Sequence, residues 1–218
     1  MNLTIQNTKD GSNTIYSEVF KETYHSINGA ITESMHVFIR EGLSICKRNP
    51  IRIFEVGFGT GLNALLTLIE SQRLAIQIEY EAIELYPIEN DLYNHLGYEE
   101  LLAFNKPRFK AIYEASWDKR IEILSSFHLL KIQGDLLKFN PVSNYDLIYF
   151  DAFSPVTQPE LWTEEIFKKL YTQLNIEGIL TTYCAKGVVR RTLEKVGFKT
   201  ERLPGPPGKR EILRAIKK

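Results

Sequence analysis

Three acidic residues stand at or near the ends of short apolar segments and could act together on one ligand. They are Glu84 in the segment 76–85, Asp135 in the segment 128–135 and Asp151 in the segment 145–151. In open α/β folds, ligands bind outside the carboxyl ends of the strands, where such side chains meet. One acid in this position would be an ordinary turn residue, whereas three indicate a binding site.

A glycine-rich turn, FEVGFGTGLN at 54–63, lies between a predicted strand and a predicted helix. Glycine allows a tight turn and close approach of a ligand, and the helix start offers free N–H groups. A dinucleotide-binding turn needs its third glycine at position 62, where this sequence has Leu62. The pattern G-x-G-x-G preceded by Glu55 instead fits S-adenosylmethionine (SAM), which has no pyrophosphate.

We therefore predict a SAM site in which Glu84 accepts hydrogen bonds from the ribose hydroxyls and Asp135 contacts the adenine amino group. The predicted cofactor-binding residues are Glu55, Gly57, Phe58, Gly59, Thr60, Gly61, Asn63, Glu84, Asp135 and Asp151.

These residues need a fold that brings strand ends together. From Ile51 onward, short apolar segments alternate with helical patterns, which predicts a parallel, doubly wound α/β sheet. The link PGPPGK is too short for a crossover helix, so the last two strands should form an antiparallel hairpin. The predicted strands are 51–56, 76–85, 128–135, 145–151, 178–184, 198–203 and 210–216, and the predicted helices are 61–72, several segments within 88–126, 159–174 and 186–196.

Seven strands with a final hairpin are the arrangement of the class I SAM-dependent methyltransferase fold, which is Rossmann-like. Residues 1–48 do not follow the alternation. We predict that they form an N-terminal extension, a hairpin and a helix, packed on a methyltransferase domain of residues 49–218.

The composition is that of a globular protein, with 44% hydrophobic and 25% charged residues among 218. No stretch reaches the roughly 18 apolar residues that a membrane helix needs, and the polar N-terminus lacks a signal-peptide pattern. Cys46 and Cys184, with the four histidines, have no metal-ligand spacing. We expect a cytoplasmic protein with no membrane partner and no metal.

The net charge of zero hides an asymmetry. Residues 181–218 contain eleven Lys or Arg and three Glu, which gives this end of the chain a net charge of +8. Such a segment favours an anionic partner such as nucleic acid, although a solvated basic helix and tail would have the same composition.

Longer segments of the chain resemble the MnmC/MnmD tRNA methyltransferase family. They are VGFGTGLN, FDAFSPVTQPELW, TYCAKGVVRRTLEKVGF, GPPGKREILRA and, near the start, YSEVFKETYHS and GAITESMHVFI. The resemblance implies SAM-dependent methylation of the 5-aminomethyl group of uridine, often 2-thiouridine, at wobble position 34 of the tRNA anticodon loop. Bifunctional members carry a flavin-dependent oxidase domain, whereas this chain stops at Lys218, which implies a stand-alone methyltransferase without flavin.

The resemblance implies a primary amine as the methyl acceptor, and Asp151 is the predicted catalytic residue. A protonated amine, with a pKa of about 10.4 if it resembles lysine, cannot attack a methyl group. The carboxylate could orient the ammonium and help remove its proton, provided that burial raises the pKa of Asp151.

We further predict a substrate-binding set, with the basic members contacting tRNA phosphates. It comprises Phe153, Pro155, Tyr183, Lys186, Arg190, Lys209 and Arg210. Phe153 or Trp162 could stack on the uracil, although core packing is the favoured interpretation for Trp162. Arg210 and Glu211 are placed in the last strand, with one of them facing the sheet or the pocket. In the extension, Tyr24, His25, Glu33 and His36 could close over the methionine end of SAM.

Other functions remain open at this point. Polyamine synthases share the fold and have an Asp at the same strand end, so a small-molecule amine methyl- or aminopropyltransferase is the alternative. A nucleic-acid-binding module without catalysis disagrees with the intact glycine turn and three strand-end acids. A nicotinamide dehydrogenase disagrees with Leu62 and the final hairpin.

Overall fold

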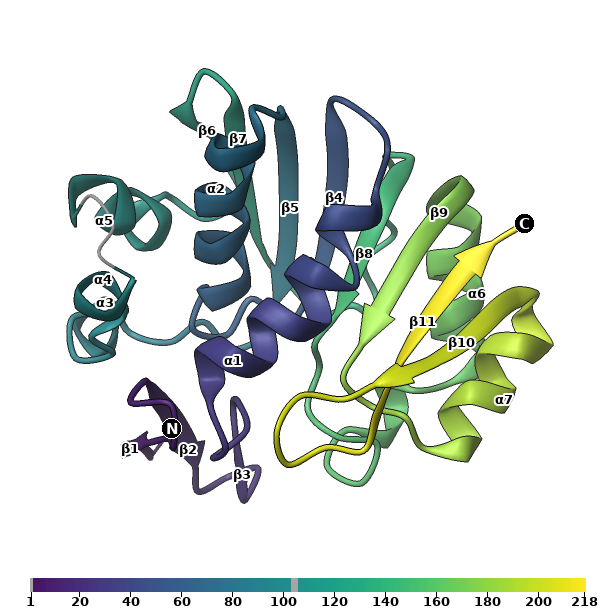
Figure 1. Ribbon diagram of the computed structural model, residues 1–218, viewed down its shortest axis with the longest axis horizontal. Helices are drawn as coiled ribbons and strands as arrows, with labels where there is room; N and C mark the ends of the chain where they lie inside the picture. The colour runs from purple at the N-terminus through teal and green to yellow at the C-terminus, as the bar shows by residue number, and fades with distance from the viewer. Residues whose placement is uncertain (1, 103–105) are drawn as a thin grey trace.

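The computed structural model describes residues 2–102 and 106–218, and its centre is an eight-stranded sheet with the order β10-β11-β9-β8-β4-β5-β7-β6 (Figure 1). The strands are β4 (Ile51–Val56), β5 (Ile78–Glu84), β6 (Arg120–Leu124), β7 (Phe127–Gln133), β8 (Tyr145–Phe150), β9 (Leu174–Thr182), β10 (Phe198–Pro204) and β11 (Glu211–Lys217). Neighbours from β7 to β9 are parallel, whereas β11 is antiparallel to β9 and β10. The predicted class I methyltransferase fold and its final hairpin are confirmed.

The eighth strand corrects the prediction that the region 88–126 is helical. β6 pairs antiparallel with β7 at the edge of the sheet. Its sequence RIEIL alternates with period two, and Ile121 and Ile123 pack against the core, as expected for a half-buried edge strand. The same region holds α3 (Asn90–Tyr93), α4 (Tyr98–Leu101) and α5 (Lys106–Glu114), while residues 103–105 lie outside the described residues.

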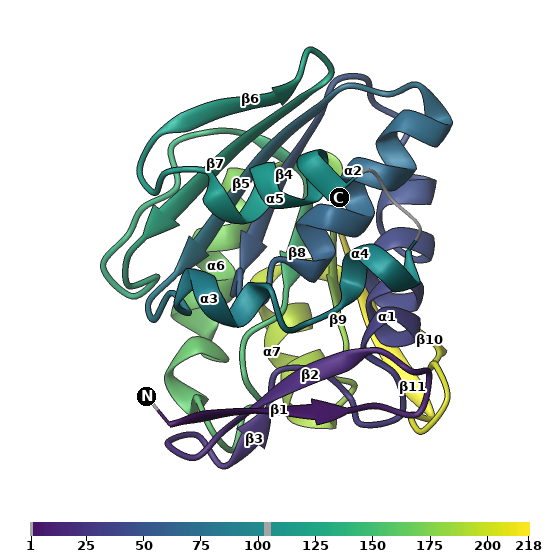
Figure 2. The ribbon, with the colours of Figure 1, turned by 90° about the vertical axis from the view of Figure 1, so that its left-hand side faces the viewer.

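Helices cover both faces of the sheet (Figure 2). One hydrophobic cluster joins the sheet to α1, η1, α2 and α5, and a second joins it to α6 and α7. All six residues of β8 are therefore buried, as expected for a central parallel strand. The helices not yet delimited are α1 (Ala30–Ser34), the π-helix η1 (Met35–Arg40), the 3-10 helices η2 (Leu43–Ile45) and η3 (Pro159–Leu161), α2 (Leu62–Leu74), α6 (Glu164–Gln173) and α7 (Gly187–Val196).

The predicted helix 159–174 is in fact two elements. η3 ends at Leu161, and α6 begins after Thr163, whose Oγ1 accepts a hydrogen bond from the Ile166 N–H at 3.4 Å. Thr163 is therefore the N-cap of α6. α7 ends as predicted at Gly197, which has a left-handed conformation.

The N-terminal residues form a small antiparallel sheet of β1 (Leu3–Asn7), β2 (Asn13–Ser17) and β3 (Glu22–Thr23). This small sheet lies beyond the carboxyl ends of β8 and β9 (Figure 1). Ile15 of this small sheet belongs to the same hydrophobic cluster as α2. The division into an extension of residues 1–48 and a methyltransferase domain of residues 49–218 stays a prediction. Among the described helices, none has the length and apolar character to cross a membrane.

Candidate active site

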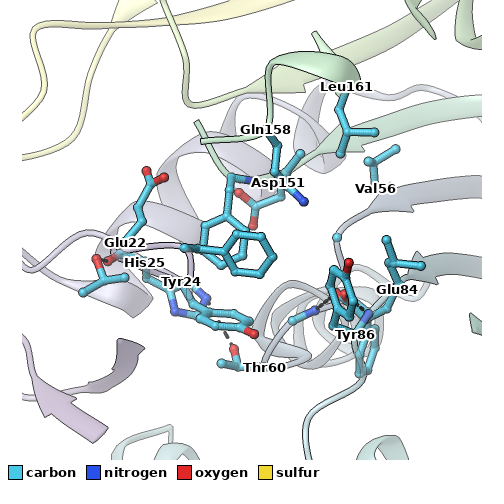
Figure 3. Close-up of a pocket in the computed structure, with 18 of the residues that line it drawn as sticks. Glu22, Tyr24, His25, Val56, Thr60, Glu84, Tyr86, Asp151, Gln158 and Leu161 are labelled. Atoms are coloured by element: carbon cyan, nitrogen blue, oxygen red, sulfur yellow. Dashed lines mark hydrogen bonds between the residues drawn. The ribbon is translucent and has the colours of Figure 1, made fainter. Parts of the chain in front are cut away.

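A cavity of 640 Å³ lies at the carboxyl ends of β4, β5, β7 and β8. Its volume is in the range of small-molecule sites, about 300–1,000 Å³. Figure 3 shows Glu84 and Asp151 in its wall on the sheet side, with Tyr24 and His25 from the N-terminal extension facing them. Asp135 also lines the cavity, so the fold brings the three predicted strand-end acids to one space.

The glycine turn passes from β4 into α2 along the cavity. Gly57 has a φ of 89°, and a Cβ atom there would lie 2.7 Å from the carbonyl oxygen of Asp151. Gly61 has a φ of 68° and precedes the first residue of α2. A side chain at Gly57 would be strained and would clash with the Asp151 backbone, whereas one at Gly61, which does not line the cavity, would clash with the Phe58 ring.

Glu84 is held by backbone groups. Its Oε2 accepts a hydrogen bond from the Gly59 N–H at 3.0 Å and its Oε1 accepts one from the Tyr86 N–H at 2.9 Å. Burial raises the pKa of Glu84, and these two N–H groups oppose the shift. Each carboxylate oxygen keeps a further lone pair, so Glu84 can still accept hydrogen bonds from a ligand.

Asp135 lies in the turn after β7, beside the end of β5 that carries Glu84. Its Oδ1 accepts a hydrogen bond from the Leu137 N–H at 2.9 Å. Ile83, Leu136 and Leu137 line the cavity beside it. A carboxylate next to an apolar surface suits a flat, aminated ring.

Asp151 follows β8 and is held by a side chain. Its Oδ2 accepts a hydrogen bond from Asn63 Nδ2 at 2.8 Å, and the same nitrogen donates to Glu55 Oε1 at 2.9 Å. Glu55 is fully buried at the end of β4, and Asn63 lies in the first turn of α2. Asn63 therefore joins two carboxyl groups from neighbouring parallel strands.

The pKa of Asp151 is raised to about 7. Burial is the largest cause and the charge of Glu33 adds to it, whereas the Asn63 hydrogen bond and the Lys209 charge lower the pKa. Lys209 Nζ lies 2.5 Å from Glu33 Oε1 and 4.0 Å from the centre of the Tyr183 ring. A carboxyl group with a pKa near neutrality can accept a proton at physiological pH.

Aromatic side chains close the cavity around Asp151. Phe153 stacks on Phe20 with ring centres 4.6 Å apart and meets the edge of Tyr24 at 5.0 Å. Tyr183 donates its hydroxyl to the Ala152 carbonyl oxygen at 2.9 Å. Trp162 is buried and donates Nε1–H to the Phe153 carbonyl oxygen at 2.8 Å, which confirms its core role.

Comparison with known proteins agrees with this geometry. The family model Methyltransf_30, described as S-adenosyl-L-methionine-dependent methyltransferase, matches residues 107–218, just over half of the chain. The chain belongs to this family. The class I fold, the SAM cofactor and methyl transfer follow from this membership.

The resemblance to MnmC-type proteins is confirmed as well. The chain is 31% identical over 222 residues to the tRNA 5-methylaminomethyl-2-thiouridine biosynthesis bifunctional protein MnmC of Cupriavidus metallidurans, and 31% identical over 215 residues to the protein of the same name from Pseudomonas fluorescens. Each match covers 91% of this chain and 32% of the relative, so this methyltransferase spans about a third of their length.

Solved structures show the same fold. A crystal structure of MNMC2 from Aquifex aeolicus matches with a TM-score of 0.76 and 27% identity, covering 98% of this chain and 70% of the other. Spermidine synthase from Thermotoga maritima matches with a TM-score of 0.60 and 13% identity, over 99% of this chain and 69% of the other, which shows a shared fold alone.

The residues of this methyltransferase fit SAM. Gly57 and Gly59 bring the backbone of the turn to the cavity wall, Glu84 offers free lone pairs for the ribose, and Asp135 borders an apolar wall for the adenine. Phe58 and Thr60 also line the cavity, but their side chains point into the protein. Phe58 packs on Trp117, and Thr60 Oγ1 lies 3.3 Å from His25 Nε2.

The structure divides the predicted substrate-binding set. Phe153, Tyr183 and Lys209 line the cavity. The other members do not, namely the half-buried Pro155, the exposed Lys186 and Arg210, and Arg190, which pairs with Glu194 at 2.6 Å. The placement of Arg210 in the last strand was wrong, because β11 begins at Glu211. The Oε2 atom of Glu211 lies 3.6 Å from Nη1 of Arg202.

The extension contributes more than the sequence suggested. Tyr24, His25 and Glu33 line the cavity as predicted, whereas His36 does not and instead lies 2.8 Å from the Pro204 carbonyl oxygen. Sequence reasoning missed Phe20 and Glu22, both of which line the cavity. Glu22 Oε2 accepts a hydrogen bond from the Ser154 N–H at 3.3 Å. Their spacing shows no periodicity that would have revealed them.

No group of three or more potential metal ligands occurs among the described residues.

Proposed function

We propose that this methyltransferase converts 5-aminomethyl-(2-thio)uridine at wobble position 34 of tRNA to 5-methylaminomethyl-(2-thio)uridine. The observation that carries the proposal is Asp151, a carboxyl group with a pKa of about 7 in the cavity wall. The names of the MnmC relatives support the nucleoside. The proposal includes a cytoplasmic location, no requirement for flavin or metal, and tRNA as the partner.

The residues of this chain have separate roles in the reaction. SAM, when bound, supplies an electrophilic sulfonium methyl group, which the acceptor nitrogen takes as the carbon–sulfur bond breaks. Glu84, Asp135 and the glycine turn hold the cofactor. Asp151 orients the aminomethyl ammonium and accepts its proton, which frees the nitrogen lone pair. Holding nitrogen and methyl carbon in line supplies much of the acceleration.

The cavity also shields the reaction from water. Phe20, Tyr24 and Phe153 form an aromatic cluster in the cavity wall. Tyr183 and Lys209 form a second wall next to Asp151. A base that enters between these walls would meet aromatic faces, which is how proteins hold unstacked RNA bases.

The tRNA backbone is proposed to contact exposed cations outside the cavity. Lys186 and Arg210 are exposed and belong to the segment 181–218 with its net charge of +8. Arg190 is engaged with Glu194, so its phosphate contact requires that this surface ion pair opens. Surface pairs of this kind contribute about 0–1 kcal/mol, which a phosphate contact can exceed.

The test is methyl transfer from labelled SAM to tRNA from cells that lack this gene, followed by digestion and identification of the nucleoside. We expect label in 5-methylaminomethyl-(2-thio)uridine with the wild type and almost none with Asp151→Ala. Small amines, including polyamines, are assayed in parallel. Label in a small amine and none in tRNA would replace the proposal with the small-molecule alternative.

A further inference from the structure

A single side-chain amide connects Asp151 to a second acid behind it. Asn63 is 3% exposed, and its Nδ2 donates to Asp151 Oδ2 at 2.8 Å and to Glu55 Oε1 at 2.9 Å. Both N–H bonds of the amide are used in this way. The opposite orientation would turn the amide oxygen toward two acceptor oxygens, so the two acids determine the orientation of Asn63.

Glu55 is suited to anchor this amide. It is fully buried, and its second oxygen, Oε2, has no hydrogen-bond partner within standard geometry among the described residues. Burial raises the pKa of Glu55 well above its usual range, since an ionised carboxylate in such a place has little solvation. The other oxygen of Glu55, Oε1, accepts the hydrogen bond from Asn63.

We propose that Asn63 is the positioning residue for methyl transfer: Glu55 anchors its amide, which holds one oxygen of Asp151 and leaves the other for the acceptor amine. The identity of that amine rests on the proposed function. The arrangement replaces the sequence-based expectation that Glu55 and Asn63 bind the cofactor directly.

The hydrogen bond has a second effect on Asp151. Donation from Asn63 favours the ionised carboxylate and so opposes the effect of burial on the pKa. The charged or titratable groups that face Asp151 from the surrounding elements are Glu55, Tyr80, Glu33, Lys209 and Tyr183. Substitution of Asn63 leaves all of them in place, so a change in the titration of Asp151 reports on the Asn63 amide.

The first experiment follows the ¹³C carboxyl resonance of Asp151 against pH in the whole protein, with Asp151→Asn to assign the signal. In Asn63→Ala the pKa of Asp151 should rise by about one unit, a tenfold change in proton affinity. The matched control is Thr67→Val, a buried position one turn further along α2 whose hydroxyl lies 3.3 Å from the Tyr149 hydroxyl. It should leave the titration unchanged.

Glu55→Gln tests the anchor and keeps an uncharged acceptor oxygen at the same place. If Glu55 acts on Asp151 only through the Asn63 amide, the pKa of Asp151 should stay near its wild-type value. A clear fall would mean that the charge of Glu55 had been raising this pKa directly, and the proposal would be wrong. Asn63→Ser, whose hydroxyl is too short to bridge both acids, replaces Asn63→Ala if that variant does not fold.

The second experiment measures single-turnover methyl transfer against pH at saturating SAM. In Asn63→Ala we expect the rising limb to move to higher pH, with a loss of about tenfold at pH 7 that is recovered in part at pH 9. SAM affinity should stay within about threefold of the wild type. Weaker SAM binding with an unmoved pH profile would instead make Asn63 a cofactor contact. If wild-type protein methylates no tRNA, the proposed function fails, and the carboxyl titration still decides the role of Asn63.

Discussion

Glu84 and Asp151, two carboxyl groups in the cavity wall, are held in different ways. Glu84 accepts hydrogen bonds from two backbone N–H groups, those of Gly59 and Tyr86. Asp151 accepts one from the side-chain amide of Asn63, while Glu33 and Lys209 act on it through their charges. Glu33 comes from α1 and Lys209 from the loop between β10 and β11.

This difference separates cofactor binding from proton transfer. Backbone N–H groups in turns cannot be changed by substitution and hold Glu84 as an acceptor for a constant ligand. Side chains from distant elements act on Asp151, and each can raise or lower its pKa. The region that must carry a proton is therefore the one whose electrostatics depends on tertiary contacts.

The largest expected effect, on the rate of methyl transfer, comes from substitution of Asp151. Asp151→Asn keeps the shape of the side chain and removes the base, so the rate of methyl transfer should fall by about 10²–10⁴-fold. SAM affinity should change little. Single-turnover transfer and isothermal titration with SAM measure the two quantities.

Glu84→Ala should give the reverse result. The loss of a charged hydrogen-bond acceptor for the ribose should weaken SAM binding by about 10–100-fold, with most of the rate recovered at saturating SAM. Equal losses of SAM affinity and of rate in both variants would contradict the division of roles between Glu84 and Asp151.

Adjacent cations on the β10–β11 loop offer a finer comparison. Lys209 pairs with Glu33 in the cavity wall, whereas Arg210 is exposed. Lys209→Ala removes a charge that lowers the pKa of Asp151, so the rising limb of the pH–rate profile should move to higher pH. Arg210→Ala should leave the profile unchanged and reduce the salt dependence of tRNA binding by about one phosphate contact. A pH shift in both variants would mean that Lys209 acts only through the general charge of the loop.

Stability against pH should separate His25 from Asp151. Burial lowers the pKa of His25 from 6.5 to about 4, so stability should fall as the pH falls from about 6.5 to about 4. The raised pKa of Asp151 acts in the opposite direction, and stability should fall as the pH rises from about 4 to about 7. Each group contributes at most about 1.4 kcal/mol per pH unit.

Thermal unfolding between pH 4 and pH 8 measures both effects. Because the two effects oppose each other between pH 4 and pH 6.5, His25→Gln should make stability fall more steeply as the pH rises, and Asp151→Asn should make it fall more steeply as the pH falls. Thr192→Ala, a change on the exposed face of α7, serves as the control and should keep both slopes. A wild-type profile that His25→Gln leaves unchanged would show that the buried ring is not the acid-sensitive group.

The smallest expected effect concerns the loop behind Asp151. Trp162→Phe keeps most of the packing against Phe150 and removes the hydrogen bond to the Phe153 carbonyl oxygen. Unfolding in denaturant should show a loss of about 1–3 kcal/mol, and SAM affinity should be retained. A large loss of SAM affinity would place this loop at the cofactor end of the cavity.

Much of the fold could be predicted because it depends on local patterns. Alternating apolar strands and helices, glycines at the turn after β4 and a short link before β11 are each visible within a few residues. β6 was missed because five residues of an edge strand, half exposed, carry a weak signal. The sequence predicted one helix over 159–174, and the cap at Thr163 that separates α6 from η3 was missed.

The cofactor end of the site was predictable for the same reason. Gly57, Gly61 and Glu84 lie at strand ends, and parallel strands must end on one side of the sheet. The sequence could not show that Asn63 faces two acids, that Phe20 stacks on Phe153, or that Lys209 pairs with Glu33. Those contacts join residues far apart in the chain.

The amino-acid sequence by itself determined the sheet, the glycine turn and the three strand-end acids, because backbone geometry and hydrophobic periodicity act over short distances. Only the tertiary structure decided the pKa shifts of Asp151 and Glu55. These shifts depend on burial, on the Asn63 amide from α2 and, for Asp151, on charges brought from α1 and the β10–β11 loop, and no local pattern encodes those distances.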